Sequence, residues 1–344
     1  MDYDTFLRRL PKAELHVHFI GSVRPETLVS LARKNEIALP TEDPGRLYEY
    51  DNIFDFLKIF DIVGRSIVER DDFARVAYET LEDGVRLGNL KYREMFFNPT
   101  SHTMEGIAYP TVVDGIVDGI RQAERDFGVK CRLIAAIHRG HSVAAAQSMI
   151  EEVVRVRRDE VIGLGSDALP EDGTEGLELF AATYAYAKKQ GLRLCAHAAE
   201  QPGTAVNFNY ALDVLKCDRI DHGYRVLDDA TVLARAREEG TWFACATTST
   251  SRVYGWPDLS QHPIRRMVEE GLRITINTDD PTMFQTDIGH EFAVTCTAME
   301  FSAGTAAQLA LNGVDASWLD EGERRALRRS FEQEITQLRS VLAM

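Results

Sequence analysis

The first residues whose types and spacing could do chemistry are His16 and His18, two positions apart near the start of the chain. They follow the short segment Pro11-Lys12-Ala13-Glu14. Side chains on an extended segment alternate with a period of two, so both imidazoles point to one face and can reach a single ion. The pair alone fits either a metal site or two polar core residues, and further ligands elsewhere in the chain must decide.

Polar residues of the same kind follow three later apolar runs. His197 and Glu200 follow the first of these runs, Asp221-His222-Gly223 the second, and Asn277-Thr278-Asp279-Asp280-Pro281 the third. Together with the first pair, four of the nine histidines stand at the ends of such runs. This clustering is unexpected for independent core histidines and favours one shared site.

The elements that must position these residues are short apolar runs that alternate with longer amphipathic stretches, a pattern typical of βαβ units and a parallel sheet. Eight strands are predicted: Glu14–His18, Leu90–Phe97, Lys130–Ile137, Val161–Leu164, Arg193–His197, Arg219–His222, Thr241–Cys245 and Arg273–Asn277. Helices are predicted over Asp72–Leu87, Pro110–Phe127, Val143–Arg158, Gly176–Gln190, Thr204–Leu215, Asp228–Glu239 and Pro263–Glu270. Each separation is long enough for a right-handed crossover.

Eight strands with helical returns predict an α/β fold of the (β/α)8 barrel type, with residues 1–344 as a single domain. The block Arg24–Val68 is longer than one crossover needs, and we expect it to form extra helices over the barrel mouth. The segment from Asp315 onward predicts one or two amphipathic helices that pack on the outside.

The working residues of such barrels lie at the C-terminal ends of the strands, so the four polar run ends are expected to face one mouth. Imidazole nitrogens and a carboxylate oxygen suit zinc, and a catalytic site leaves one position open for water. The predicted ligands of one Zn²⁺ per chain are His16, His18, His197 and Asp279. A bound divalent ion lowers the pKa of water to about 7.

Three more residues at these ends have candidate roles. Glu200, just beyond a strand end, is a candidate proton donor or shuttle, and His222 could take a proton from water or orient it. Asp280 points away from Asp279 and could accept a hydrogen bond from a substrate. Each also has a purely structural alternative. Glu200 could be a neighbour of a helix N-cap, His222 a packed strand end, and Asp280-Pro281 a turn. The four strand ends taken together outweigh these alternatives.

Composition restricts the partners. A formal net charge of -15 without a basic block argues against nucleic acid and anionic membranes, but it leaves a small nucleobase or nucleoside open. No run approaches the roughly 18 apolar residues of a membrane span, and the acidic N-terminus lacks a signal-peptide pattern, so we expect a cytoplasmic protein. The five cysteines are widely spaced and predict buried free thiols. The sequence leaves the oligomeric state open, and a homo-oligomer is one of the alternatives.

Four segments together resemble the adenosine deaminase branch of the amidohydrolase superfamily. They are Pro-Lys-Ala-Glu-Leu-His-Val-His at 11–18, His-Ala-Ala-Glu at 197–200, Arg-Ile-Asp-His-Gly-Tyr at 219–224 and Asn-Thr-Asp-Asp-Pro at 277–281. The resemblance extends over essentially the whole chain. It implies zinc-dependent hydrolytic deamination of a 6-aminopurine, such as adenosine, to the 6-oxopurine and ammonia.

The resemblance also implies roles for individual residues. Glu200 would protonate ring nitrogen N1, His222 would act on the water that attacks C6, and Asp280 would hydrogen-bond N7. A backbone amide after the fourth strand would face N3, and Ala168 is our choice for it. No lysine lies in Val161–Asp167, where relatives with two metal ions carry a bridging lysine, and this absence favours one metal ion.

The sequence departs from the family pattern after the histidine pair. Nucleoside deaminases have an aspartate there that engages the ribose 5′-hydroxyl, and adenine-specific relatives often have glutamate. This chain has Ile20, which cannot accept a hydrogen bond. An unpaired buried hydroxyl lowers affinity, so Ile20 predicts a substrate without a free 5′-hydroxyl or with an apolar group there. The alternatives to adenosine are therefore adenine and a 5′-modified adenosine such as aminodeoxyfutalosine.

Other departures and alternatives stay open at this point. Phe96-Phe97-Asn98-Pro99-Thr100 is closer to the adenine deaminases than to the adenosine deaminases. Arg139 predicts either contact with an anionic substrate tail or a surface salt bridge. The stripe Ile53, Phe56 and Phe60 is more typical of core packing than of a substrate lid. A metal-dependent esterase or amidase and a zinc-stabilised binding protein are the competing functional classes.

Overall fold

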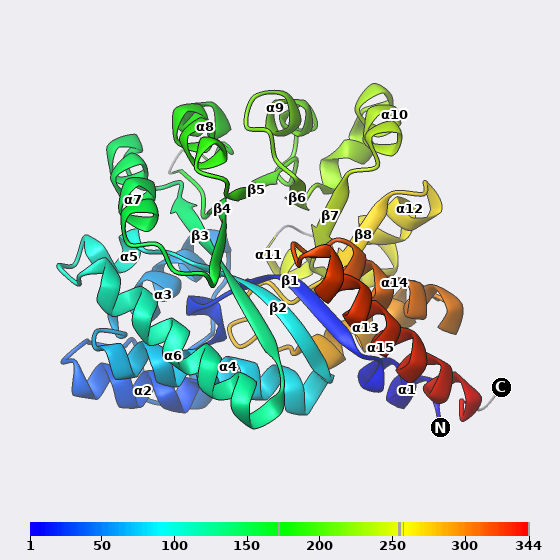
Figure 1. Ribbon diagram of the computed structural model, residues 1–344, viewed down its shortest axis with the longest axis horizontal. Helices are drawn as coiled ribbons and strands as arrows, with labels where there is room; N and C mark the ends of the chain where they lie inside the picture. The colour runs from blue at the N-terminus through cyan, green and yellow to red at the C-terminus, as the bar shows by residue number, and fades with distance from the viewer. Residues whose placement is uncertain (171–172, 254–255, 257, 343–344) are drawn as a thin grey trace.

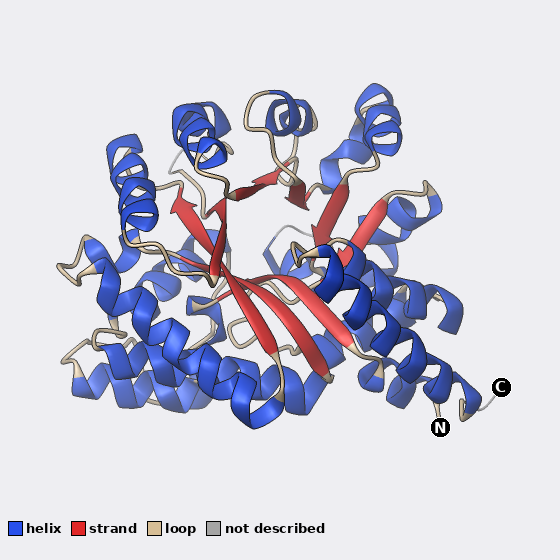
Figure 2. Cartoon of the chain, in the orientation of Figure 1, coloured by secondary structure: helices blue, strands red, loops and turns tan. Residues whose placement is uncertain are grey.

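Eight parallel strands form a barrel in the computed structural model, which describes residues 1–170, 173–253, 256 and 258–342. The strands pair in sequence order. They are β1 Lys12–His18, β2 Leu90–Phe97, β3 Lys130–His138, β4 Val161–Asp167, β5 Arg193–Ala198, β6 Arg219–His222, β7 Trp242–Cys245 and β8 Arg273–Ile276. Figure 2 shows the strands as a ring with helices outside it, which confirms the predicted (β/α)8 barrel.

The barrel closes between β1 and the segment that follows β8. Val17 bridges Asp279 in parallel, and the His18 N–H donates to the Asp279 carbonyl at 2.7 Å. The Asp279 N–H donates to the His16 carbonyl at 3.2 Å. The closing contact therefore lies within the predicted site and brings the first and last strand ends together.

Helices cover the barrel and extend it at both chain ends, as Figure 1 shows. Those that lie between successive strands in the chain are α2 Pro25–Lys34, α3 Ile53–Arg65, α4 Arg70–Gly88, α5 Thr100–Thr103, α6 Tyr109–Phe127, α7 Val143–Arg155, α8 Ala181–Lys189, α9 Asn207–Asp213, α10 Ala230–Glu239, α11 Thr247–Val253 and α12 Pro263–Glu269. The helix before β1 is α1 Tyr3–Arg9, and those after β8 are α13 Ile288–Ala298, α14 Ala303–Asp315 and α15 Glu321–Ser340. In the described part of the chain, no helix is long and apolar enough to span a membrane.

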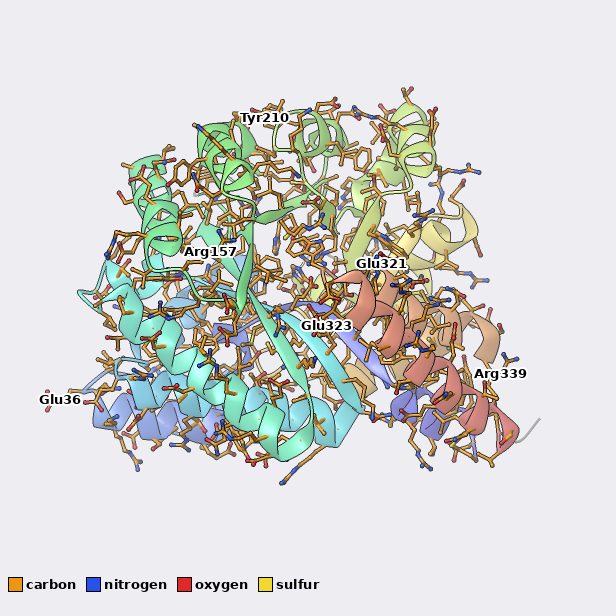
Figure 3. All side chains as sticks on the ribbon, viewed as in Figure 1. Glu36, Arg157, Tyr210, Glu321, Glu323 and Arg339 are labelled. Carbon is orange, nitrogen blue, oxygen red and sulfur yellow. The ribbon has the colours of Figure 1, made fainter. Side chains whose placement is uncertain are left out.

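Side chains fill the space inside the ring of strands, while charged residues such as Glu36 and Arg339 lie at the periphery in Figure 3. Between the strands and α4, the Arg93 guanidinium pairs with Glu14 at 2.6 Å and donates to the Thr80 carbonyl at 2.9 Å. A second oxygen of Glu14 accepts the Thr278 N–H at 3.0 Å. Buried ionic groups persist when they are paired and hydrogen-bonded, and this pair ties the β8 exit to β1.

Some predicted boundaries differ from the structure. β4 continues to Asp167, three residues beyond its predicted end, because the small residues Gly165 and Ser166 still pair with β3. The predicted helix Gly176–Gln190 is a 3-10 turn, Leu177–Phe180, followed by α8. All five cysteines are buried free thiols, as predicted.

Candidate active site and metal centre

The four predicted metal ligands come together at the C-terminal end of the barrel. His16 and His18 extend from β1, His197 from β5, and Asp279 follows β8. One ligand atom of each lies within 4.8 Å of the others, and all four residues are buried. Three imidazoles and a carboxylate packed this closely, away from solvent, are a donor set that suits a divalent ion.

Carboxylates behind the histidines set which ring nitrogen faces the ligand cluster. Asp221 Oδ1 lies 3.2 Å from His16 Nδ1, and Asp167 Oδ2 lies 3.2 Å from His18 Nδ1. Both Nε2 atoms therefore face Asp279 Oδ1, each at 3.2 Å. A carboxylate at the second ring nitrogen fixes the tautomer and strengthens the imidazole as a ligand, so these residues fit a divalent ion.

Asp279 is held by a residue that sequence reasoning missed. The Ser249 hydroxyl on α11 donates to Asp279 Oδ2 at 2.5 Å. The start of α11 is fixed in turn by Glu291, which accepts the Thr247 N–H at 2.7 Å and the Thr248 N–H at 2.8 Å. One Asp279 oxygen thus faces the histidines and the other is tied to the β7 exit.

Glu200 and His222 form an acid and base pair beside the ligand cluster. His222 Nε2 lies 3.4 Å from Glu200 Oε1. Burial, with the Asp279 charge adding to it, raises the pKa of Glu200 to about 8. Burial lowers the pKa of His222 to about 3. At neutral pH the Glu200 carboxyl therefore keeps a proton that it can donate, while the His222 imidazole is neutral.

Asp280 lies against the backbone of Gly21. A Cβ on Gly21 would lie 1.8 Å from Asp280 Oδ1. Burial raises the pKa of Asp280 well above its usual value, and its Oδ1 has no hydrogen-bond partner among the described residues. Asp280 is thus a buried carboxyl group whose unpartnered oxygen packs against Gly21.

The ligands His18, His197 and Asp279 line one cavity together with Glu200, His222 and Asp280. Apolar side chains form much of the rest of its described wall, and Phe56 stacks on Phe284 with ring centroids 4.9 Å apart. The apolar residues are Ile53, Phe56, Leu57, Phe60, Ala168, Leu169, Val253 and Phe284. The stripe on α3 therefore forms part of the cavity wall, and Phe56 and Phe60 also belong to the hydrophobic core, which was the preferred prediction.

Two predicted substrate-binding residues have different placements. Ala168 lines the cavity with a left-handed backbone, φ 56°, and its contact with the substrate stays a prediction. Ile20 is fully buried and is not among the described residues that line the cavity. Its Cδ1 would lie 3.1 Å from a Cβ on Gly64, so it packs beneath α3.

Arg139 lies in the cavity wall. Of the two alternatives predicted for it, the surface salt bridge is wrong. The residue is buried, and Nε donates to the Ala168 carbonyl at 2.8 Å. Nη1 donates to the carbonyls of Glu175 at 3.0 Å and His197 at 3.2 Å. The guanidinium therefore joins the exits of β3, β4 and β5.

Comparisons with known proteins agree with this arrangement. A family model described as "Adenosine deaminase" matches residues 11–334. An adenine deaminase of Trichlorobacter lovleyi is 35% identical over 343 residues, with 96% of each chain covered. An adenine deaminase of Cupriavidus taiwanensis is 34% identical over 316 residues, covering 91% of this chain and 89% of the relative.

Two solved structures share the fold closely. An amidohydrolase from Burkholderia ambifaria with bound Zn superposes with a TM-score of 0.91 at 32% identity and covers 98% of this chain and 94% of that one. An adenine deaminase from Arthrobacter aurescens has a TM-score of 0.89 at 30% identity, with coverage of 96% and 100%.

Proposed function

The chain belongs to the adenosine deaminase family of hydrolytic C–N deaminases, and from this premise we propose that it is a zinc-dependent adenine deaminase. The observation that carries the proposal is the meeting of the four-ligand cluster with Glu200, His222 and Asp280 in one cavity. The reaction consumes adenine and water and yields hypoxanthine and ammonia. The partner is thus a small purine base.

Adenine is favoured over adenosine by two observations. Relatives that cover most of this chain are named adenine deaminases. In addition, Ile20 stands where nucleoside deaminases present a carboxylate to the ribose, and it can accept no hydrogen bond. A ribose hydroxyl buried without a partner costs about 1–3 kcal/mol. A planar base without a sugar avoids this cost, and apolar side chains such as Phe56 and Phe284 line the cavity that would receive it.

Zinc is proposed as the ion because three imidazoles and one carboxylate are a donor set it prefers. His16, His18, His197 and Asp279 would hold it, and an amidohydrolase that aligns with nearly the whole chain is described with bound Zn. A zinc ion supplies a water molecule of lowered pKa and a positive charge near the reacting carbon.

The residues of this chain divide the remaining work. Protonated Glu200 donates to purine N1 and makes C6 more electrophilic, while neutral His222 accepts a proton from the attacking water. Protonated Asp280 donates a hydrogen bond to N7, which burial of this carboxyl favours because it raises the pKa. The two ring contacts fix the base so that its amino-bearing carbon faces the ligand cluster.

The test is an ammonia-release assay of the zinc-loaded protein with adenine, adenosine and a 5′-modified adenosine, with Glu200→Gln as the matched control. We expect kcat/KM for adenine to exceed that for adenosine by about 100-fold, because Ile20 offers the ribose no hydrogen-bond acceptor. A preference for either nucleoside would refute adenine as the substrate. Retained metal with no ammonia from any aminopurine would favour a zinc-stabilised binding protein.

A further inference from the structure

A buried carboxylate outside the cavity wall holds the turn that carries the catalytic glutamate. It belongs to Glu175, in the segment between β4 and α8. Three consecutive main-chain N–H groups donate to it: Ala199 at 3.0 Å, Glu200 at 2.7 Å and Gln201 at 3.1 Å. Successive N–H groups that converge in this way form an anion-binding nest, and here the anion is a side chain of the same protein.

The same carboxylate reaches the following helix. Asn207 Nδ2 donates to Glu175 Oε2 at 2.6 Å, and the Thr204 hydroxyl lies 2.9 Å from Oε1. Both carboxylate oxygens are therefore occupied by donors from the β5 exit and the start of α9. Such a carboxylate is costly to replace, because its removal leaves the buried N–H groups of Ala199 and Glu200 without an acceptor.

The carbonyl groups of the turn are fixed from the opposite direction. Arg225 donates its N–H to the Ala199 carbonyl at 2.8 Å and its Nε to the Glu200 carbonyl at 3.2 Å. Ala199 itself has a left-handed backbone, φ 52°, which is unfavourable for a residue with a Cβ. The turn thus keeps a strained conformation because hydrogen bonds hold it from both sides.

We propose that Glu175 is a positioning residue for the reaction, which holds the Ala199–Gln201 turn so that the Glu200 carboxyl faces the purine. This inference rests on the proposed deaminase function. Glu200 lies 3.4 Å from His222 in this arrangement. A shift of about 1 Å in a catalytic group can lower a rate about 100-fold, so the effect of losing the carboxylate passes through Glu200.

The test compares Glu175→Gln with a matched control, Asp72→Asn, in the zinc-loaded protein with adenine. Gln retains one acceptor oxygen but places an NH₂ among N–H donors. Asp72 is also a buried carboxylate that accepts from two main-chain N–H groups and two side chains, but it lies at the start of α4 and does not line the cavity. We expect Glu175→Gln to lower kcat about 100-fold with unchanged zinc content. Asp72→Asn should lower the Tm without lowering kcat.

A Glu200→Gln background separates positioning from a general structural role. If Glu175 acts through Glu200, Glu175→Gln should lower the residual kcat of Glu200→Gln by less than about threefold. Equal losses in both backgrounds, or a Glu175→Gln kcat within about threefold of wild type, would overturn the proposal. If Glu175→Gln does not fold, Glu175→Asp replaces it, because the charge stays but the arm is one carbon too short.

Hydrogen exchange gives a readout that needs no turnover. In Glu175→Gln, the amides of Ala199, Glu200 and Gln201 should exchange about tenfold faster than in wild type, with the Asp72→Asn protein unchanged there. If wild type releases no ammonia from adenine, the proposed function fails and this measurement still decides whether Glu175 holds the turn. Unchanged exchange at these amides would overturn the inference by itself.

Discussion

Replacing Gly21 by alanine tests the placement of Asp280 without touching Asp280 itself. The added Cβ would lie 1.8 Å from Asp280 Oδ1 and 2.4 Å from its Cβ. Nonbonded carbon atoms sit about 3.5–4.0 Å apart, so one partner must move by more than about 1 Å. The Gly21 carbonyl accepts the Thr282 N–H at 3.1 Å, which ties this backbone to the loop after β8. The displacement therefore falls on the Asp280 side chain.

The expected loss follows from the hydrogen bond that moves away. Both partners are neutral in the proposed arrangement, and leaving a buried polar group unpaired costs about 1–3 kcal/mol. At about 1.4 kcal/mol for each factor of ten, Gly21→Ala should lower kcat/KM for adenine by about 5- to 150-fold. Zinc content should stay at the wild-type level, because Asp280 is not among the four clustered ligands.

Steady-state kinetics on three proteins measure this effect: Gly21→Ala, Asp280→Ala and the double variant. The double variant should match Asp280→Ala, since the alanine at 21 then has no carboxyl to displace. Gly304→Ala is the control, because Gly304 is exposed on α14 and its nearest neighbour, Ser302 Oγ, would be 3.5 Å from the new Cβ. A folded Gly21→Ala protein with wild-type kcat/KM would refute the role of Asp280 in binding the purine.

Four further outcomes are expected. Glu200→Gln should keep its zinc in metal analysis and lose about 10²–10⁴ in kcat, and full activity would contradict the acid role. Because burial raises the pKa of Glu200 to about 8 and the protonated form donates, kcat/KM should fall tenfold per unit above about pH 8 in a pH–rate profile. This fall in kcat/KM at high pH should be absent in Glu200→Gln. Ser249→Ala should weaken zinc affinity about 10- to 100-fold in a chelator competition, since it frees one Asp279 oxygen. Chelator should lower the Tm and zinc should restore it, and a metal-independent Tm would speak against a site that binds only the folded chain.

The sequence predicted the parts of the site that depend on regular alternation. His16 and His18 share a face because β1 is extended, and Arg219–His222 is a strand with the predicted bounds. Apolar runs of strand length, separated by amphipathic stretches, were sufficient to count eight strands and to locate their ends. Once the barrel is known, residues at the ends of different strands must meet, whatever their separation along the chain.

Sequence periodicity could not predict the contacts that irregular segments make. Glu175 has no periodic neighbours, and its partners are 24–32 residues away along the chain. Arg139 was expected to meet solvent or a substrate tail, yet it donates to main-chain carbonyls that no sequence pattern identifies. Ile20 was located by its spacing from the histidine pair, but its burial beneath α3 depends on how a 3-10 turn leaves β1.

The residues hardest to anticipate are those with left-handed backbones at strand exits. Ala168, Ala199, His222 and Asp279 have φ values of 56°, 52°, 65° and 66°, and each follows or ends a strand at the site. None is glycine, so local preference argues against the conformation that each adopts. Such strain persists only where surrounding bonds over-determine it, as the carboxylate of Glu175 does at Ala199. The turns with unfavourable backbone conformations are thus the ones that direct the metal ligand, the base and the acid toward a common point. Activity should therefore be most sensitive to remote substitutions in the hydrogen bonds that hold these turns.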